Sequence, residues 1–537
     1  MFSLDNIQEE KEQDIDNLAI ESYDQDGGTI QFDMSIDVLD TGEGIAVRIG
    51  YCTALFKEAT IAHIASHYEE LLRSIVKDPS ETIRDLSMLT AEEEGQVLHL
   101  FNATEVSYPL EETFVSLFEV QVSKTPDAIA VSFEGVDLSY KALDEASNQL
   151  AHYLHSQGVG EDALVGICVE RSFAMLIGIV GILKAGGAYV PIKPDYPASR
   201  IQHILGDTQS KVVITDASSD DLITTSYPEV TTVVVGSEDA VYADQPTTSV
   251  NITIAPSSLG YVIYTSGSTG TPKGAMIEHS GMLNHLLLMI DELDMDSDSV
   301  VAFTAPFTFD ISVWQLLSGL LTGGRIVIYS EEMILDPLVL QGSLHDDGVS
   351  ILQLVPSYVS GLLDIDSIKD LRHLQYFLVT GEAAHHSLLL KWFARYPEIP
   401  VVNAYGPAEA SDDVSLHIMR ECPAEGIVPI GVPVANMDIY VVDDKGQLCP
   451  IGAVGELWVS GVGVGRGYVN DPEKTANSFI VNPFKDSGYK VYKTGDLGRW
   501  LPDGSLEFIG RKDNQVKVRG YRIELGEIEN VLSGLAG

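Results

Sequence analysis

The sequence predicts an α/β protein with layered, mainly parallel sheets. Short apolar runs rich in valine and isoleucine, such as ALVGICVE (163–170) and KVVITD (211–216), recur along the middle of the chain. Segments with helical spacing, such as 139–156 and 172–186, separate most of these runs. Buried strands that alternate with helices are typical of a parallel sheet covered by helices. A second series of this kind runs from about 300 to 405, so we expect two α/β layered subdomains.

The two ends of the chain carry other patterns. Residues 30–38 and 45–51 alternate between apolar and polar side chains, which predicts a β-hairpin with one buried face. Apolar residues at helical spacing over 61–75 predict a helix after it. Residues 78–112 are polar and contain prolines, which indicates a linker with short helical pieces. Beyond residue 427, glycine-punctuated strands without intervening helices predict a β-rich subdomain.

Composition excludes several classes of function. The 537 residues include 79 acidic and 32 basic side chains, and a net charge of −47 repels nucleic acid and anionic membranes. The acidic N-terminus does not resemble a signal peptide, and the most apolar stretch carries Lys184 and several glycines. The four cysteines are scattered without a CxxC pair, so neither a zinc site nor a disulfide framework is indicated. We expect a cytoplasmic protein that binds neither nucleic acid nor membrane.

A glycine-rich loop, YTSGSTGTPKG (264–274), follows the apolar run LGYVIY. Backbone N–H groups in such a loop converge on phosphate oxygens, and hydroxyl side chains add further donors. The loop is not a Walker-type P-loop, because Pro272 precedes Lys273 and Gly274 follows it. The string predicts a phosphate site with a lysine at its end.

The loop TSGSTGTPKG resembles the phosphate loop of the adenylate-forming superfamily. Further strings are similar, in order, to signatures of the adenylation domains of nonribosomal peptide synthetases: LSYKALDEASNQLA (138–151), LKAGGAYVPIKPDYP (183–197), FDIS (309–312), NAYGPAEA (403–410), GELWVSGVGVGRGY (455–468), YKTGDL (492–497) and GRKDNQVKVRGYRIELGEIE (510–529). The resemblance implies an adenylate-forming fold. In that fold a large N-terminal core, with two α/β layered subdomains and a β-rich subdomain, precedes a small C-terminal subdomain.

The resemblance also implies a domain organisation. The hairpin and helix in 1–85 are similar to the C-terminal end of a condensation domain, and 86–112 is the linker. The adenylation core is expected over 113–511, and 512–537 would be the start of a truncated C-terminal subdomain. The family's lysine that contacts the substrate carboxylate is expected beyond Gly537, so we expect this chain to bind its substrates but to adenylate slowly. An excised core and a domain interrupted by an insertion both remain open.

The implied reaction joins an amino acid and ATP into an aminoacyl-adenylate, with Mg²⁺ as cofactor and a phosphopantetheine thiol on a downstream carrier domain as acceptor. Lys273, Glu409 and Arg511 are the implied catalytic residues, and Glu409 would contact Mg²⁺. For several of these positions a purely structural role is the alternative: a core tyrosine at 405, a turn glycine at 381 and exposed charges at 409, 496 and 511. The implied nucleotide-binding residues are Thr265, Ser266, Gly267, Ser268, Thr269, Gly270, Lys273, Gly381, Tyr405, Asp496 and Arg511.

Asp310 is the implied partner of the substrate's α-ammonium group, since a buried cation requires a paired carboxylate; a helix cap is the alternative. Two more carboxylates suit a second cationic group, and Trp314 favours a short side chain. The set resembles pockets for 2,4-diaminobutyrate, while ornithine, lysine and diaminopropionate remain open as substrates. Other roles also remain open for two residues: Asp412 could face solvent or cap a helix, and Asp413 could bind a hydroxyl group. The implied pocket residues are Asp310, Ile311, Trp314, Gln353, Leu378, Thr380, Ala404, Asp412 and Asp413.

A second hypothesis is a non-catalytic binding module or interaction platform within a megasynthase. Ala408 favours it, because the family usually has threonine at this position of the NAYGPAEA string. The intact nucleotide-binding strings oppose it. In either case the expected partners are an amino acid and the carrier and condensation domains of the same assembly line.

Overall fold

The computed structural model divides the chain into two compact units, Met1–Gly95 and Gln96–Gly537, which are described separately. The structure describes residues 1–6, 30–40, 44–83, 85–237, 239–267, 271–365, 370–423, 426–486, 488–513, 515–518, 520–525, 528 and 532.

The first unit contains a three-stranded sheet and helix α1 (Glu58–Lys77). Strands β2 (Met34–Asp40) and β3 (Ile45–Tyr51) form the predicted antiparallel hairpin, whose turn at 41–43 lies outside the described residues, and β1 (Phe2–Asn6) pairs with β2 in parallel. A short helix, α2 (Ala91–Gly95), ends the unit.

Two details of the predicted hairpin are wrong. The first strand begins at Met34 rather than at Ile30, and the expected buried face of β3 is open, with Ile45 68% and Val47 40% exposed. The described part of the unit has one sheet and one long helix, which is too little structure to cover this face along its whole length.

In the second unit, the predicted alternation of strands and helices is confirmed. Strands β6 to β9 pair in parallel, and β6 and β8 are buried along almost their whole length, as expected for strands covered on both faces. The seven-stranded sheet has the order β21 (Gly467–Tyr468), β11 (Lys273–Glu278), β10 (Leu259–Thr265), β7 (Ala188–Pro191), β6 (Leu164–Cys168), β8 (Val212–Thr215) and β9 (Thr231–Val234).

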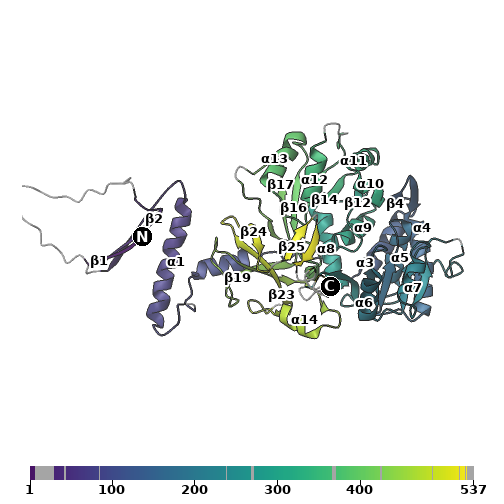
Figure 1. Cartoon of the computed structure of the whole chain (residues 1–537), viewed down its shortest axis with the longest axis horizontal. Coiled ribbons are helices and arrows are strands. Elements are labelled where there is room, and N and C mark those ends of the chain that lie inside the picture. The colour runs from purple at the N-terminus through teal and green to yellow at the C-terminus, as the bar shows by residue number, and fades with distance from the viewer. Residues whose placement is uncertain are drawn as a thin grey trace, which may run out of the picture. The chain divides into compact units, whose positions relative to one another are not determined.

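A nine-stranded sheet forms the second α/β layer. Its order is β18 (Val432–Pro433), β17 (Ser415–Met419), β16 (Val401–Tyr405), β15 (Tyr376–Val379), β14 (Ile351–Leu354), β12 (Val300–Phe303), β13 (Arg325–Ile328), β4 (Ile129–Phe133) and β5 (Val136–Ser139). Figure 1 shows α4 to α7 gathered in one part of this unit and α10 to α13 in another. The helices are α3 (Phe114–Lys124), α4 (Tyr140–Ser156), α5 (Phe173–Lys184), α6 (Ala198–Thr208), α7 (Asp220–Ser226), α8 (His279–Glu292), α9 (Ile311–Thr322), α10 (Glu331–Leu335), α11 (Pro337–Asp346), α12 (Pro356–Leu363) and α13 (His386–Arg395).

The β-rich subdomain is also confirmed, although it includes one helix, α14 (Pro472–Ser478), that the strand pattern did not predict. Asp471 caps this helix and Pro472 occupies its first turn. These two residues favour the start of a helix even though strands precede and follow it. The strands are β19 (Met437–Val442), β20 (Gly455–Gly461), β22 (Phe479–Val481), β23 (Lys490–Trp500) and β24 (Leu506–Arg511), followed by a separate hairpin of β25 (Gln515–Val518) and β26 (Tyr521–Glu524).

The sheets bring the functional motifs to their carboxyl edges. Strand β10 ends at Thr265 and β11 begins at Lys273, and these two residues face each other in the antiparallel register. The parallel strands β12, β14, β15 and β16 run in one direction, so the segments after them meet at one edge, where ligands bind in open α/β sheets. Among the described helices, none combines the length and apolar character needed to cross a bilayer.

A short segment after the π-helix at Gln96–Leu100 is anchored to the β-rich sheet. The Asn102 side chain donates to the carbonyl oxygens of Val97 (2.8 Å) and Ile439 (3.0 Å) and accepts from the Ile439 amide (2.8 Å). The Phe101 ring packs 5.1 Å from the Trp500 ring. Asn102 is buried, so its amide satisfies backbone groups that water does not reach.

We expect Asn102→Ala to destabilise the large unit by about 1–3 kcal/mol, because buried backbone groups lose their partners. Urea denaturation followed by tryptophan fluorescence measures the change. The exposed Gln157→Ala serves as the control and should leave the midpoint unchanged. Equal midpoints for Asn102→Ala and the parent would contradict the anchoring role.

Candidate functional site

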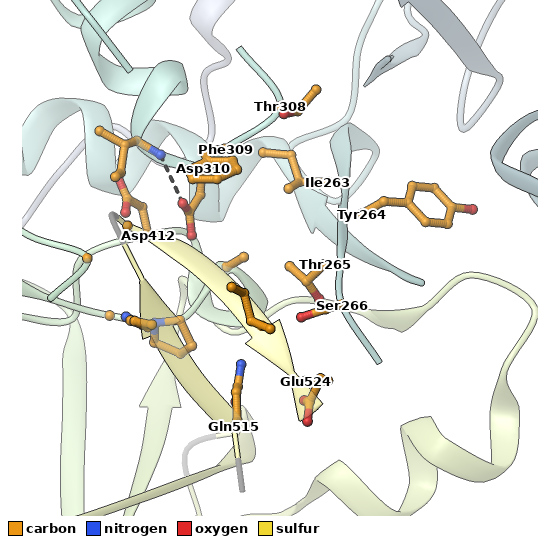
Figure 2. A pocket seen from close by; sticks show the side chains of 18 of the residues that line it. Ile263, Tyr264, Thr265, Ser266, Thr308, Phe309, Asp310, Asp412, Gln515 and Glu524 are labelled. Atoms are coloured by element: carbon orange, nitrogen blue, oxygen red, sulfur yellow. Dashed lines mark hydrogen bonds between the residues drawn. The ribbon is translucent and has the colours of Figure 1, made fainter. Parts of the chain in front are cut away.

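The main cavity has a volume of about 670 Å³ and lies where the carboxyl edge of the nine-stranded sheet meets the end of β10 and the β25–β26 hairpin. Figure 2 shows Asp310 and Asp412 together at one end and Ser266, Gln515 and Glu524 toward the other. The cavity joins residues from six of the sequence strings. The predicted residues that line it are Thr265, Ser266, Asp310, Ile311, Thr380, Gly381, Asp412, Asp496 and Arg511.

The remaining predicted pocket residues lie behind this lining or beside it. Gln353 lines a second cavity of about 230 Å³, which also touches Ile311 and Thr380. The Trp314 indole N–H donates to Gln353 Oε1 at 2.9 Å, and both side chains are buried. Leu378, Ala404 and Asp413 are buried in the adjoining core.

The phosphate loop is described only at its two ends, and Ser268, Thr269 and Gly270 lie outside the described residues. At Gly267, an added Cβ would collide with the Thr271 carbonyl oxygen, so only glycine fits.

The loop lysine lies in a compact polar cluster with Glu409 and Tyr468. Lys273 Nζ is 2.7 Å from Glu409 Oε1 and donates to the Tyr468 hydroxyl at 2.8 Å, and that hydroxyl donates to Glu409 Oε1 at 2.9 Å. The Glu409 side chain is fully buried, which rules out the exposed-charge alternative at this position. Tyr468 had no role predicted from the sequence, although it ends the string GELWVSGVGVGRGY.

A second cluster joins Tyr405, Asp496 and Arg511. The Tyr405 hydroxyl donates to Asp496 Oδ2 at 2.6 Å, and Arg511 donates to Asp496 Oδ1 at 2.8 Å. Asp496 and Arg511 face each other across the pair β23–β24, and Arg511 also binds Asp513. Burial and the neighbouring Asp496 raise the pKa of Tyr405 well above its usual value. Asp496 and Arg511 are mostly buried, so neither is an exposed charge.

Asp310 caps helix α9 and also lines the cavity. Its Oδ1 accepts a hydrogen bond from the Ile311 amide at 3.0 Å, so Asp310 has the helix-capping role that was the alternative to ammonium binding. The two roles are compatible, because a carboxylate accepts several hydrogen bonds. Burial, together with the negative charge of Asp413, raises the pKa of Asp310 to about 6.

A strained turn places the other two carboxylates. Ser411 and Asp412 have φ angles of 65° and 81°, in the left-handed region that ordinary side chains avoid. A Cβ at Gly406 would collide with the Asp412 carbonyl oxygen, so the turn folds directly onto the end of β16. Asp412 faces the cavity and is almost fully buried, so a solvent-facing Asp412 is excluded.

This end of the cavity therefore holds closely spaced negative groups. Burial, then Asp413 and Asp310, raise the pKa of Asp412 well above its usual value. Asp412 Oδ2 and both Asp413 carboxylate oxygens have no hydrogen-bond partner among the described residues. Lys517 on β25 lines the same cavity and opposes the charge of Asp310 and Asp412. Such an environment favours a bound cation.

Several other lining residues had no predicted role. Gln515, Lys517 and Glu524 come from the β25–β26 hairpin, within the last quoted string, whose function was not assigned residue by residue. Phe309 directly precedes Asp310, and Arg200 comes from α6, far away in sequence. The proximity of α6 to β10 depends on the sheet order, which no local pattern specifies.

We expect Asp310→Asn to stabilise the ligand-free protein at neutral pH. Between its usual pKa of 3.8 and about 6, folded Asp310 holds a proton that the unfolded chain has released, so parent stability falls as pH rises through that interval. The asparagine still caps α9 but carries no charge, and its advantage should grow to the order of 2–3 kcal/mol above this interval. Denaturant midpoints measured across this pH range test the prediction, and a difference that does not change with pH would contradict it.

Comparisons with known proteins agree with this geometry. The family model described as AMP-binding enzyme matches residues 118–469, and the one described as condensation domain matches residues 1–98. Gramicidin S synthase 2 of Brevibacillus brevis is 39% identical over 541 residues, which is 98% of this chain and 12% of that relative. Tyrocidine synthase 3 of Brevibacillus parabrevis is 38% identical over 100% of this chain and 8% of its own length. The chain thus spans a small part of the curated relatives that it matches.

Solved structures share the fold. The nonribosomal peptide synthetase FmoA3 in its α-methyl-L-serine–AMP-bound form has a TM-score of 0.82 and 26% identity, over 94% of this chain and 56% of that one. A four-domain nonribosomal peptide synthetase bound to AMP and glycine has a TM-score of 0.80 and 28% identity, over 94% of this chain and 37% of that one. The predicted segment boundaries and residue roles stay predictions. The chain belongs to the AMP-binding enzyme family, with a condensation-domain fragment at its N-terminal end.

Proposed function

We propose that this chain selects an α-amino acid and activates it with ATP as an aminoacyl-adenylate for nonribosomal peptide synthesis. One observation carries the proposal: a single cavity joins an Asp496–Arg511 pair at the phosphate-loop side to buried carboxylates at the other end. This arrangement suits a ligand with a nucleotide at one end and an ammonium group at the other. Relatives named as peptide synthases, and neighbours bound to AMP and amino acids, support the same conclusion.

At the nucleotide end, Asp496 would accept hydrogen bonds from the ribose hydroxyls while Tyr405 packs on adenine. Thr265, Ser266 and Lys273 would hold the phosphates, and Arg511 would stabilise negative charge near the ribose and α-phosphate. Gly381 lines the cavity at φ +79°, a left-handed backbone conformation that favours glycine.

Glu409 fits the role of a Mg²⁺ ligand, because it is a buried carboxylate beside the loop lysine and magnesium favours a carboxylate plus phosphate oxygens. Bound Mg²⁺ would offset charge on the phosphates. The chain's own groups position the reactants, so that a substrate carboxylate oxygen attacks the α-phosphorus and the bond to pyrophosphate breaks.

At the amino-acid end, Asp310 would pair with the α-ammonium group and Asp412 and Asp413 with a second cation on the side chain. Trp314 and Gln353, which are hydrogen-bonded to each other, would limit the length of that side chain. A short diamino acid such as 2,4-diaminobutyrate fits these groups best. A carrier domain with a phosphopantetheine thiol would then accept the acyl group, and the condensation fragment suggests a neighbouring condensation domain as partner.

The rival function is a non-catalytic binding platform, and Ala408 is the observation in its favour. Ala408 lines the cavity, where the resemblance implies a threonine hydroxyl directed at the α-phosphate. ATP–pyrophosphate exchange with a panel of amino and fatty acids separates the two functions. Amino-acid-dependent exchange that Asp310→Ala abolishes supports activation, whereas binding without exchange supports the platform, and exchange with fatty acids alone would refute the role of Asp310.

We expect Asp496→Ala to weaken ATP binding by about 10- to 100-fold, because the ribose loses hydrogen bonds to a charged group. Calorimetric titration of the chain with ATP measures the dissociation constant. The exposed Asp486→Ala removes the same charge elsewhere and should leave affinity unchanged. Equal affinities for parent and Asp496→Ala would contradict the assigned ribose contact.

We expect Ala408→Thr to exchange pyrophosphate faster than the parent, by about tenfold or more, because the new hydroxyl adds a hydrogen bond to a charged group. The exchange assay at saturating ATP and amino acid measures the rate. Ala408→Val provides a control of similar shape without the hydroxyl. Equal or faster exchange by the parent would contradict this account of the position.

A further inference from the structure

A histidine outside all the signature strings lies next to Asp412 and Asp413, and of these three residues Asp412 lines the cavity. His285 lies on α8 and is only 4% exposed. Its Nε2 is 3.9 Å from Asp412 Oδ2 and 3.7 Å from Asp413 Oδ2. The Nε2 atom and both of these oxygens lack a hydrogen-bond partner among the described residues. Three buried polar atoms thus converge without satisfying one another.

The fold fixes this convergence. Gly281, one helical turn before His285, packs so closely that a Cβ there would lie 2.8 Å from Ser411 Oγ. The Ser411 hydroxyl is held by the Gly463 carbonyl at 2.6 Å, and Asn284 donates to the Ala435 carbonyl at 2.9 Å. Helix α8 is therefore held against the strained turn that carries the two aspartates, and also against the backbone at Ala435.

We infer that His285, Asp412 and Asp413 form a three-acceptor receptor for a primary ammonium group at the end of the substrate side chain. The inference rests on the proposed amino-acid-binding function and names the substrate class of that site. A primary ammonium has three N–H donors and no acceptor, so it uses three convergent acceptors fully. His285 Nε2 lies 3.9 Å from Asp412 Oδ2 and 3.7 Å from Asp413 Oδ2, which is too far for direct hydrogen bonds. A donor group placed between these atoms would hydrogen-bond to all three.

The receptor would distinguish a primary ammonium from other polar groups by the number and the arrangement of their hydrogen-bond donors. A guanidinium is a planar fork of five donors, which does not match three acceptors around one point. A hydroxyl has one donor and would leave buried acceptors unpaired. His285 is thus a specificity-determining residue in addition to the nine predicted pocket positions: with its ring proton on Nδ1, the imidazole offers Nε2 as the third acceptor.

The same three groups also have the chemistry of a divalent-metal site. The placement of the carboxylates favours the ammonium. Asp412 faces the cavity next to Asp310, and Figure 2 shows these two carboxylates at the same end of it. A diamino acid whose α-ammonium reaches Asp310 would therefore carry its second ammonium toward Asp412.

The test is calorimetric titration of the chain with 2,4-diaminobutyrate and with 2-aminobutyrate, which lacks the side-chain amine. For the parent we expect clear preference for the diamino acid. His285→Leu should reduce that preference by about tenfold or more, since one hydrogen bond to a charged group is lost, with little change for 2-aminobutyrate. His285→Gln keeps an acceptor oxygen and should retain most of the preference.

A substrate series tests the receptor without any substitution. Successive N-methylation of the side-chain amine of 2,4-diaminobutyrate removes one donor at a time, and affinity for the parent should fall at each step. Equal affinity for the amine and its dimethyl form overturns the inference, as does an unchanged preference in a folded His285→Leu. One-to-one zinc uptake by the amino-acid-free chain that His285→Leu abolishes overturns it in favour of a metal site. Absence of any amino-acid binding, or binding that Asp310→Ala leaves intact, refutes the proposed function instead.

Discussion

The negative charge shared by Asp310, Asp412 and Asp413 is the constraint on which the cavity depends. An ionised carboxylate out of contact with water costs several kcal/mol unless a cation or hydrogen-bond donors compensate it. The protein supplies partial compensation: the Ile311 amide and the N-terminus of α9 at Asp310, and the charge of Lys517 nearby. The raised pKa values of Asp310 and Asp412 show that this compensation is incomplete. A ligand that brings ammonium groups would complete it.

The opposite end of the cavity follows a different principle. There the charges are already paired within the protein, Lys273 with Glu409 and Arg511 with Asp496 and Asp513. Such pairs hold their side chains in place, and a polyphosphate must exchange protein partners to bind. The two ends are thus suited to different tasks, with recognition of a cation at the unsatisfied carboxylates and positioning of a nucleotide at the paired ones.

The sequence predicted most of what depends on local pattern. The strands and helices of the α/β layers and the phosphate loop were identified from their strings, and the carboxylates of the pocket from the family resemblance. His285 and Tyr468 were not assigned, because their roles depend on contacts between α8 and the 411–413 turn and between β11, β21 and the segment after β16. The exposed Ile45 and Val47 were misjudged for a similar reason, since alternation in a strand shows which side chains share a face but not whether anything covers it.

A count of protons exchanged on amino-acid binding tests the central claim most directly. Titration at neutral pH in buffers of different ionisation enthalpy gives that count by calorimetry. The account predicts net proton release with 2,4-diaminobutyrate, because its second ammonium favours the ionised form of a carboxyl group whose pKa is raised, and smaller release with 2-aminobutyrate. Equal release with both ligands, or proton uptake with the diamino acid, would contradict it.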